Sequence, residues 1–209
     1  MGAKLNEQDI KKEFIDSFPD NAGELAYYLW TDILELHYNW KNYRILFGTN
    51  KERIDLLNRY APNYFGSLHS ILLHDIILSI GRLTDPASSG KEKDNASINL
   101  LLKRKMGDIS KNTESDIKDL LTKTQKIRDL RNKLIAHSDL KVKLEIEEPL
   151  PGVSRAEIEE ILQLIRDIFN SLEYSFETGK TVFKDFMVMD DADFLISLIE
   201  EKEARKRKG

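Results

Sequence analysis

Hydrophobic residues recur at steps of three and four along most of this chain, a spacing that places them on one face of an α-helix. The longest such stretch runs from Leu25 to Phe47, where Gly48 is a typical helix stop. Ser154 and Glu157 form the clearest capping box, which marks the start of another long helix. The expected helices are a short one within 1–18, then 25–47, 49–60, a continuation past Pro62 to 83, 98–105, 113–136, 154–176 and a last helix capped by Asp190.

Two local signals refine these limits. Thr49 and Glu52 predict a capping box at the start of the helix expected over 49–60. Pro62 should break or kink that helix, because proline lacks the backbone N–H that a helix interior needs. We therefore expect an all-α protein, an antiparallel helical bundle, in one domain over 1–209 with its core at about 21–178 and a C-terminal helix and basic tail at 190–209.

One segment departs from the helical spacing. Hydrophobic residues alternate strictly with charged ones near 140–147, which predicts a small amphipathic β element there. A strand needs a partner, and Thr181 to Met189 is the other β-rich stretch that we consider for that role.

Composition narrows the possible chemistry. The chain has no cysteine, which excludes disulfides and thiolate metal sites, and His69 and His74 lie five residues apart, wrong for a helical metal pair. The net charge of −4 means that any RNA contact must come from local patches, such as the basic segment 123–133. No signal peptide is expected at the N-terminus, and no apolar run approaches the ~18 residues that span a bilayer. We therefore expect a cytoplasmic protein that contacts no membrane.

Arg131 is the most unusual residue of the pattern. It lies at the centre of the apolar face of its helix, four residues after Ile127 and three before Leu134. A guanidinium on such a face is costly unless it has partners, because it stays charged at any relevant pH. Two explanations remain open: a structural ion pair with an acid of a neighbouring helix, such as Asp75, or a functional site.

His137 follows Arg131 by six residues, about 120° away around a straight helix. The two side chains could meet if the helix ends near His137, or if a two-fold dimer places the histidine of one protomer beside the arginine of the other. A single histidine at a helix end is more often a cap or a surface residue. Together with an arginine on the apolar face, it becomes a candidate for proton transfer near neutral pH.

Three segments in the same order resemble the HEPN family of abortive-infection protein U, second component: WKNYRILF at 40–47, RLTDP at 82–86 and RNKLIAHSD at 131–139. The similarity extends over roughly residues 25–175. It implies an all-helical homodimer of HEPN type with a role in bacterial defence against phage or in a toxin–antitoxin system. In the superfamily, an arginine followed by four to six residues and a histidine marks a metal-independent ribonuclease site shared by two protomers. Asp139 stands where toxins controlled by a nucleotidyltransferase have a tyrosine, so that form of control is doubtful here.

The resemblance and the chemistry of the side chains suggest a role for each residue. His137 would be the acid and the base of RNA cleavage, Arg131 would stabilise charge on the phosphorane, and Asn132 would orient the histidine or the phosphate. Lys133, Arg128 and Arg82 are expected to bind RNA. Arg82 could instead pair with Asp85 at the helix end. The products would be a 2′,3′-cyclic phosphate and a 5′-hydroxyl, with no metal or cofactor.

A second function remains open: a non-catalytic HEPN module that dimerises and binds RNA, a nucleotide or a protein partner. Arg131 would then hold a ligand phosphate or a buried carboxylate. The expected partners under either function are a second copy of the chain, RNA, and an antitoxin or defence-system protein.

Overall fold

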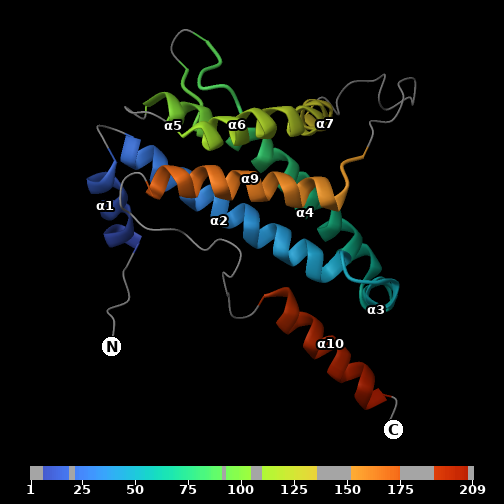
Figure 1. The fold of residues 1–209 in the computed structure, drawn as a ribbon. Coiled ribbons are helices and arrows are strands. Elements are labelled where there is room, and N and C mark those ends of the chain that lie inside the picture. Colours follow the sequence, from blue (N-terminus) through green and yellow to red (C-terminus); the bar gives the residue numbers. More distant parts are fainter. Residues whose placement is uncertain are drawn as a thin grey trace. The chain divides into compact units, whose positions relative to one another are not determined.

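The computed structural model describes residues 7–18, 22–90, 93–104, 110–135, 152–174 and 191–206, with only the backbone at 133–135, 173 and 174 (Figure 1). Its helices are α1 (Glu7–Ser17), α2 (Ala22–Phe47), α3 (Lys51–Tyr60), α4 (Pro62–Leu83), α5 (Ile98–Arg104), α6 (Lys111–Lys123), α7 (Gln125–Ile135), α9 (Arg155–Tyr174) and α10 (Ala192–Lys206). In these ranges the only β pairing is an isolated bridge between Ser88 and Asp94. The all-α prediction is confirmed. The β element expected near 140–147 and its candidate partner at 181–189 lie outside the described residues.

Helix boundaries follow local hydrogen bonding. Gly48 closes α2 as expected, and its N–H donates to Arg44 O at 2.8 Å. The cap of α3 is Asn50 rather than Thr49, because the Asn50 side chain accepts from Arg53 N at 2.9 Å. Pro62 begins α4, since its missing N–H would be unpaired in a first turn in any case. It therefore breaks the helix rather than kinking it.

The capping box of α9 is confirmed. Glu157 N donates to Ser154 Oγ at 3.2 Å, and Glu157 Oε2 accepts from Ser154 N at 2.6 Å. Hydrogen bonds to the Glu157 carboxylate from the backbone N–H and the side chain of Ser154, with a further one from Lys126, lower the pKa of Glu157 to about 2. The helix expected over 113–136 is divided at Thr124, whose hydroxyl donates to Leu120 O at 2.7 Å. Side-chain bonds of this kind to a carbonyl four residues back bend helices.

The chain forms two compact units, to which α2 and α4 both contribute. Unit 1 comprises residues 1–34 and 77–181, and unit 2 comprises 35–76 and 182–209. In unit 1, α6 lies along α9 in the antiparallel sense, because Thr113 bonds Ser171 at one end and Lys123 pairs with Glu160 at the other (Figure 1). The face that α9 buries carries seven large apolar residues: Ile158, Ile161, Leu162, Ile165, Ile168, Phe169 and Leu172.

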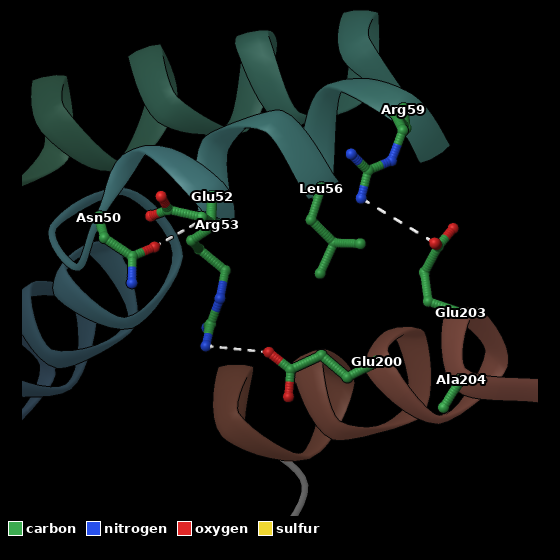
Figure 2. Close-up of a pocket in the computed structure, with 8 residues that line it drawn as sticks. All are labelled: Asn50, Glu52, Arg53, Leu56, Arg59, Glu200, Glu203 and Ala204. Atoms are coloured by element: carbon green, nitrogen blue, oxygen red, sulfur yellow. Dashed lines mark hydrogen bonds and ion pairs between the residues drawn. The ribbon is translucent and has the colours of Figure 1, made fainter. Parts of the chain in front are cut away.

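Unit 2 has its own apolar cluster, in which α10 takes part through Ala192 and Ile196. Asp191 caps α10, because its Oδ1 accepts from Asp193 N at 3.0 Å, and Asp190, the cap expected from the sequence, lies outside the described residues. Lys41 donates to Asp191 Oδ2 at 2.6 Å, and this contact lowers the pKa of Asp191. Figure 2 shows two ion pairs that join α3 to α10, Arg53 with Glu200 and Arg59 with Glu203, on either side of a hollow of about 480 Å³.

Among the described helices, α4 alone is long and apolar enough to cross a bilayer by length and composition. Five of its hydrophobic residues are buried within the protein: Phe65, Ile76, Ile77, Ile80 and Leu83. Since buried core helices pass the same test, composition is weak evidence for a membrane span here. The cytoplasmic location and the single-domain organisation both stay predictions.

Candidate functional site

Arg131 lies on α7 in unit 1 and forms an ion pair with Asp85. Its Nη1 donates to Asp85 Oδ1 at 2.7 Å, and the two side chains are 17% and 24% exposed. Ile127, one turn before Arg131 on the predicted apolar face of α7, is completely buried, while the side chain of Leu134 lies outside the described part. Arg131 therefore places a permanent charge in a mostly covered position, as its spacing predicts.

A glycine of α4 makes room for this arginine. A Cβ atom at Gly81 would lie 2.7 Å from Arg131 Cδ, closer than real Cβ atoms come to a neighbour, and 3.1 Å from Nη1, which is a tight contact. Any larger residue would displace the guanidinium from α4. Gly81 therefore permits the close approach that brings Arg131 to the end of α4, where Asp85 follows.

The turn that carries Asp85 is held from two other helices. On α5, Asn99 Nδ2 donates to Asp85 O at 2.9 Å and to Thr84 O at 3.3 Å. On α7, Arg128 Nη1 donates to Thr84 O at 3.4 Å. Because the backbone of this turn is fixed, the Asp85 carboxylate is presented to Arg131 by the fold rather than by a flexible loop.

Two pairings considered for the sequence are wrong. The acid that meets Arg131 is Asp85 rather than Asp75, whose Oδ2 accepts from Asn39 at 2.9 Å within unit 2. Arg82 does not pair with Asp85 either, and it donates from Nη2 to Ser79 Oγ at 3.2 Å. Arg82 is exposed. Burial raises the pKa of Asp32, and the positive charge of Arg82 partly opposes this rise.

The guanidinium of Arg131 is only partly used by its partner. In the described part of the chain, the buried Nε has no hydrogen-bond acceptor, and Nη2 forms no hydrogen bond. An arginine normally offers five N–H donors in a planar fork that matches carboxylate or phosphate oxygens. One edge of this fork is thus held by Asp85, while donors remain for an anionic group.

The other candidate residues divide between described and undescribed positions. Asn132 is exposed on α7 beside Arg131, and Arg128 precedes Arg131 by one helical turn. The backbone of Lys133 belongs to α7, but its side chain lies outside the described part. His137 also lies outside the described residues, so its meeting with Arg131 stays a prediction.

Asp85, Gly81 and Asn99 are the residues that sequence reasoning did not assign to this site. The signals were present: Asp85 stands inside RLTDP, one of the three segments that carry the family resemblance, and Gly81 interrupts a helical pattern. Within the described ranges, no group of three histidine or acidic side chains is placed to hold a metal ion.

An all-helical fold with an arginine held on the apolar face of a helix, followed in sequence by a histidine six residues later, is the arrangement expected of an HEPN protein. The family model AbiU2, one of the HEPN families, matches residues 19–195, and the chain belongs to this family. It is thereby an HEPN module of the abortive-infection class. Comparison with curated proteins and with solved structures gives no match.

Proposed function

We propose that this protein is a metal-independent endoribonuclease of bacterial phage defence or of a toxin–antitoxin system, with its site shared across a homodimer. The observation that carries the proposal is the Arg131 guanidinium, which is mostly covered, permanently charged and bound at one nitrogen only within the described residues. A charge held in this state can stabilise negative charge that develops on a phosphate in the transition state. Family membership supports the same function.

The chemistry needs two proton transfers and one positive charge. His137 of one protomer takes the proton from the 2′-hydroxyl, whose oxygen attacks the adjacent phosphorus. Arg131 stabilises the resulting phosphorane, and the second copy of His137 gives a proton to the departing 5′-oxygen. The bond from phosphorus to the 5′-oxygen breaks, leaving a 2′,3′-cyclic phosphate and a 5′-hydroxyl. Asn132 orients the reacting groups, Lys133 and Arg82 hold the RNA backbone, and Arg128 attracts the RNA through its positive charge.

Cleavage of single-stranded RNA in EDTA tests this proposal. Wild type should produce cyclic-phosphate ends, and His137→Ala should not. The matched control is His74→Ala, because His74 is an exposed histidine of α4 outside unit 1. The endonuclease is contradicted if wild type gives no cyclic-phosphate product, or if His137→Ala gives as much as His74→Ala.

One observation favours the second function, a non-catalytic HEPN module. The ion pair between Arg131 and Asp85 already gives the arginine a structural partner. An arginine retained only for this pair would be replaceable without loss of any RNA-dependent activity. The non-catalytic module would then act by dimerisation and by binding RNA, a nucleotide or a protein partner.

A further inference from the structure

A hollow of unit 1 adjoins the turn that carries Asp85. Its volume is about 560 Å³, and it lies between the chain that follows α4, helix α5 and the junction of α6 with α7. Pro86, Ala87 and Leu121 form an apolar part of its wall, and Asn99, Gln125 and Arg128 are its long polar side chains. The wall therefore combines an apolar surface with groups that can form hydrogen bonds.

Arg128 gives this hollow a positive charge without offering it many donors. Its guanidinium donates to Leu121 O at 2.9 Å, Gln125 Oε1 at 3.0 Å, Thr124 Oγ1 at 3.3 Å and Thr84 O at 3.4 Å. All four acceptors are neutral, so none of them cancels the charge of Arg128. Four of its five N–H groups are occupied, however, which leaves little capacity to grip a phosphate directly.

The remaining hydrogen-bonding groups are mixed in kind. Asn99 uses Nδ2 for the carbonyl oxygens of Thr84 and Asp85, and within the described ranges its acceptor Oδ1 makes no hydrogen bond. Gln125 donates one N–H to Asp129 Oδ1 at 3.1 Å and keeps a second N–H. An acceptor oxygen would repel a phosphate, whereas one acceptor, one donor and apolar neighbours suit the edge and face of a nucleobase.

We propose that this hollow binds an unpaired base of the RNA strand, on the nucleotide next to the phosphate held by Arg131. The inference rests on the proposed function, because it assumes that Arg131 meets RNA. Arg128 and Arg131 are one helical turn apart on α7, a separation of about 5–6 Å between their Cβ atoms. That distance suits two neighbouring groups of one nucleotide strand. Positive charge at both arginines would attract the backbone, while the hollow selects for the presence of a base.

Binding of two uncleavable RNAs tests the hollow separately from catalysis. The probes are 2′-O-methyl single strands of equal length, one with uracil bases and one fully abasic, so that they carry the same number of phosphates. Wild type should bind the uracil strand about tenfold more tightly than the abasic strand, since a bound base contributes measurably to affinity. Ala87→Leu, which fills the hollow with an aliphatic side chain, should remove most of this preference.

The matched control is Thr122→Leu, because Thr122 is exposed on α6 and does not line the hollow. It should keep the tenfold preference, and Gln125→Ala should reduce it several-fold. Thermal unfolding of each variant separates a lost site from a lost fold. Binding of a base in the hollow is contradicted if wild type shows no preference for the uracil strand. It is also contradicted if folded Ala87→Leu and folded Gln125→Ala both keep the preference.

Cleavage of unmodified RNA, measured in parallel, distinguishes the two proposals. Cleavage without base preference overturns the hollow and leaves the endonuclease standing. A base preference in wild type that Ala87→Leu removes, with no cleavage of unmodified RNA, supports binding of a base in the hollow and contradicts the endonuclease. If neither RNA binds, the hollow is contradicted together with the RNA-directed function.

Discussion

Arginine–carboxylate contacts occur in both units of this protein, in different surroundings. In unit 2, Arg53 with Glu200 and Arg59 with Glu203 join α3 to α10, and in each pair one side chain is more than half exposed, at 56% for Glu200 and 55% for Arg59. In unit 1, Arg131 and Asp85 are 17% and 24% exposed. In each pair of unit 2 one of the two side chains is exposed to solvent, whereas in the pair of unit 1 both side chains are largely covered.

The difference shows what each contact can do. Exposed pairs typically contribute between nothing and about 1 kcal/mol to stability, and α10 is secured chiefly by its apolar residues Ala192 and Ile196. An apolar residue could occupy the position of Arg131 at a lower cost in folding free energy. The glycine at position 81 leaves room for the Arg131 side chain. A covered charge that a simpler residue could replace is the kind of local exception found at functional sites.

The largest effect is expected from Arg131→Met, which keeps the bulk of the side chain and removes its charge. RNA cleavage should fall about 100- to 1000-fold, the usual effect of losing a donor that stabilises transition-state charge. Arg53→Met, the corresponding change in unit 2, should leave the cleavage rate within about twofold of wild type, since surface pairs contribute little. Equal rates for the two variants would show that the contacts do not differ in function.

Gly81→Ala tests whether the close approach to α4 matters. Its Cβ would crowd the end of the Arg131 side chain, which must shift, so the free energy of unfolding should fall by about 1 kcal/mol, the low end of the range for overpacking. Chemical denaturation measures this change. In an Arg131→Ala background the same glycine substitution should cost much less, because the crowded side chain is absent. A cost that is equal in both backgrounds would mean that Gly81 is required for another reason.

Asp85→Asn removes the charge that competes with phosphate for Arg131 and keeps the shape of the side chain. We expect RNA to bind several-fold more tightly, while the free energy of unfolding falls by about 1 kcal/mol as the charge-assisted bond weakens. Fluorescence titration with an uncleavable RNA and a denaturation curve measure the two quantities. Loss of stability with unchanged RNA affinity would favour a purely structural ion pair.

Arg53→Gln should lower the free energy of unfolding by less than about 1 kcal/mol, because Glu200 remains hydrated when its partner is lost. Denaturation of this variant beside Asp85→Asn compares the two surroundings directly. A cost for Arg53→Gln that exceeds the cost for Asp85→Asn would reverse the comparison between the units.

The smallest effect is a pH dependence of the start of α10. Lys41 lowers the pKa of Asp191 below its usual 3.8, so the charged form is favoured in the folded protein. This contact stabilises the fold above pH 3.8 and is lost as the pH falls through the lowered value. Amide hydrogen exchange near Ala192 should accelerate in that acid range, and less so in Asp191→Asn. Equal acceleration in both proteins would exclude Asp191 as the cause.

Much of the fold can be predicted from the sequence, because helical spacing and capping residues act over one or two turns. The C-terminal end of α2 and the cap of α9 are confirmed for this reason, while α2 begins at Ala22, three residues before the expected start. The cap of α3 falls at Asn50, one residue after the expected Thr49, because two neighbouring side chains can both cap a helix. Periodicity did not show that Thr124 divides a helix, since a side-chain bond to the backbone leaves the hydrophobic spacing unchanged.

Only part of the candidate site can be predicted from the sequence in the same way. The face on which Arg131 lies follows from its position among Ile127 and its neighbours, and this prediction is confirmed. Which acid meets Arg131 depends on how α4 and α7 pack, and no local pattern distinguishes Asp85 from Asp75. The role of Gly81 likewise becomes visible only when the two helices are placed together.

The central claim is a ribonuclease site that two protomers share through Arg131 and His137. Pairing wild type with His137→Ala, each with a different affinity tag, tests it most directly. A heterodimer purified through both tags should lose nearly all cyclic-phosphate production, because its one intact histidine cannot supply both proton transfers at a shared site. A heterodimer that keeps about half of the wild-type activity would contradict the shared site.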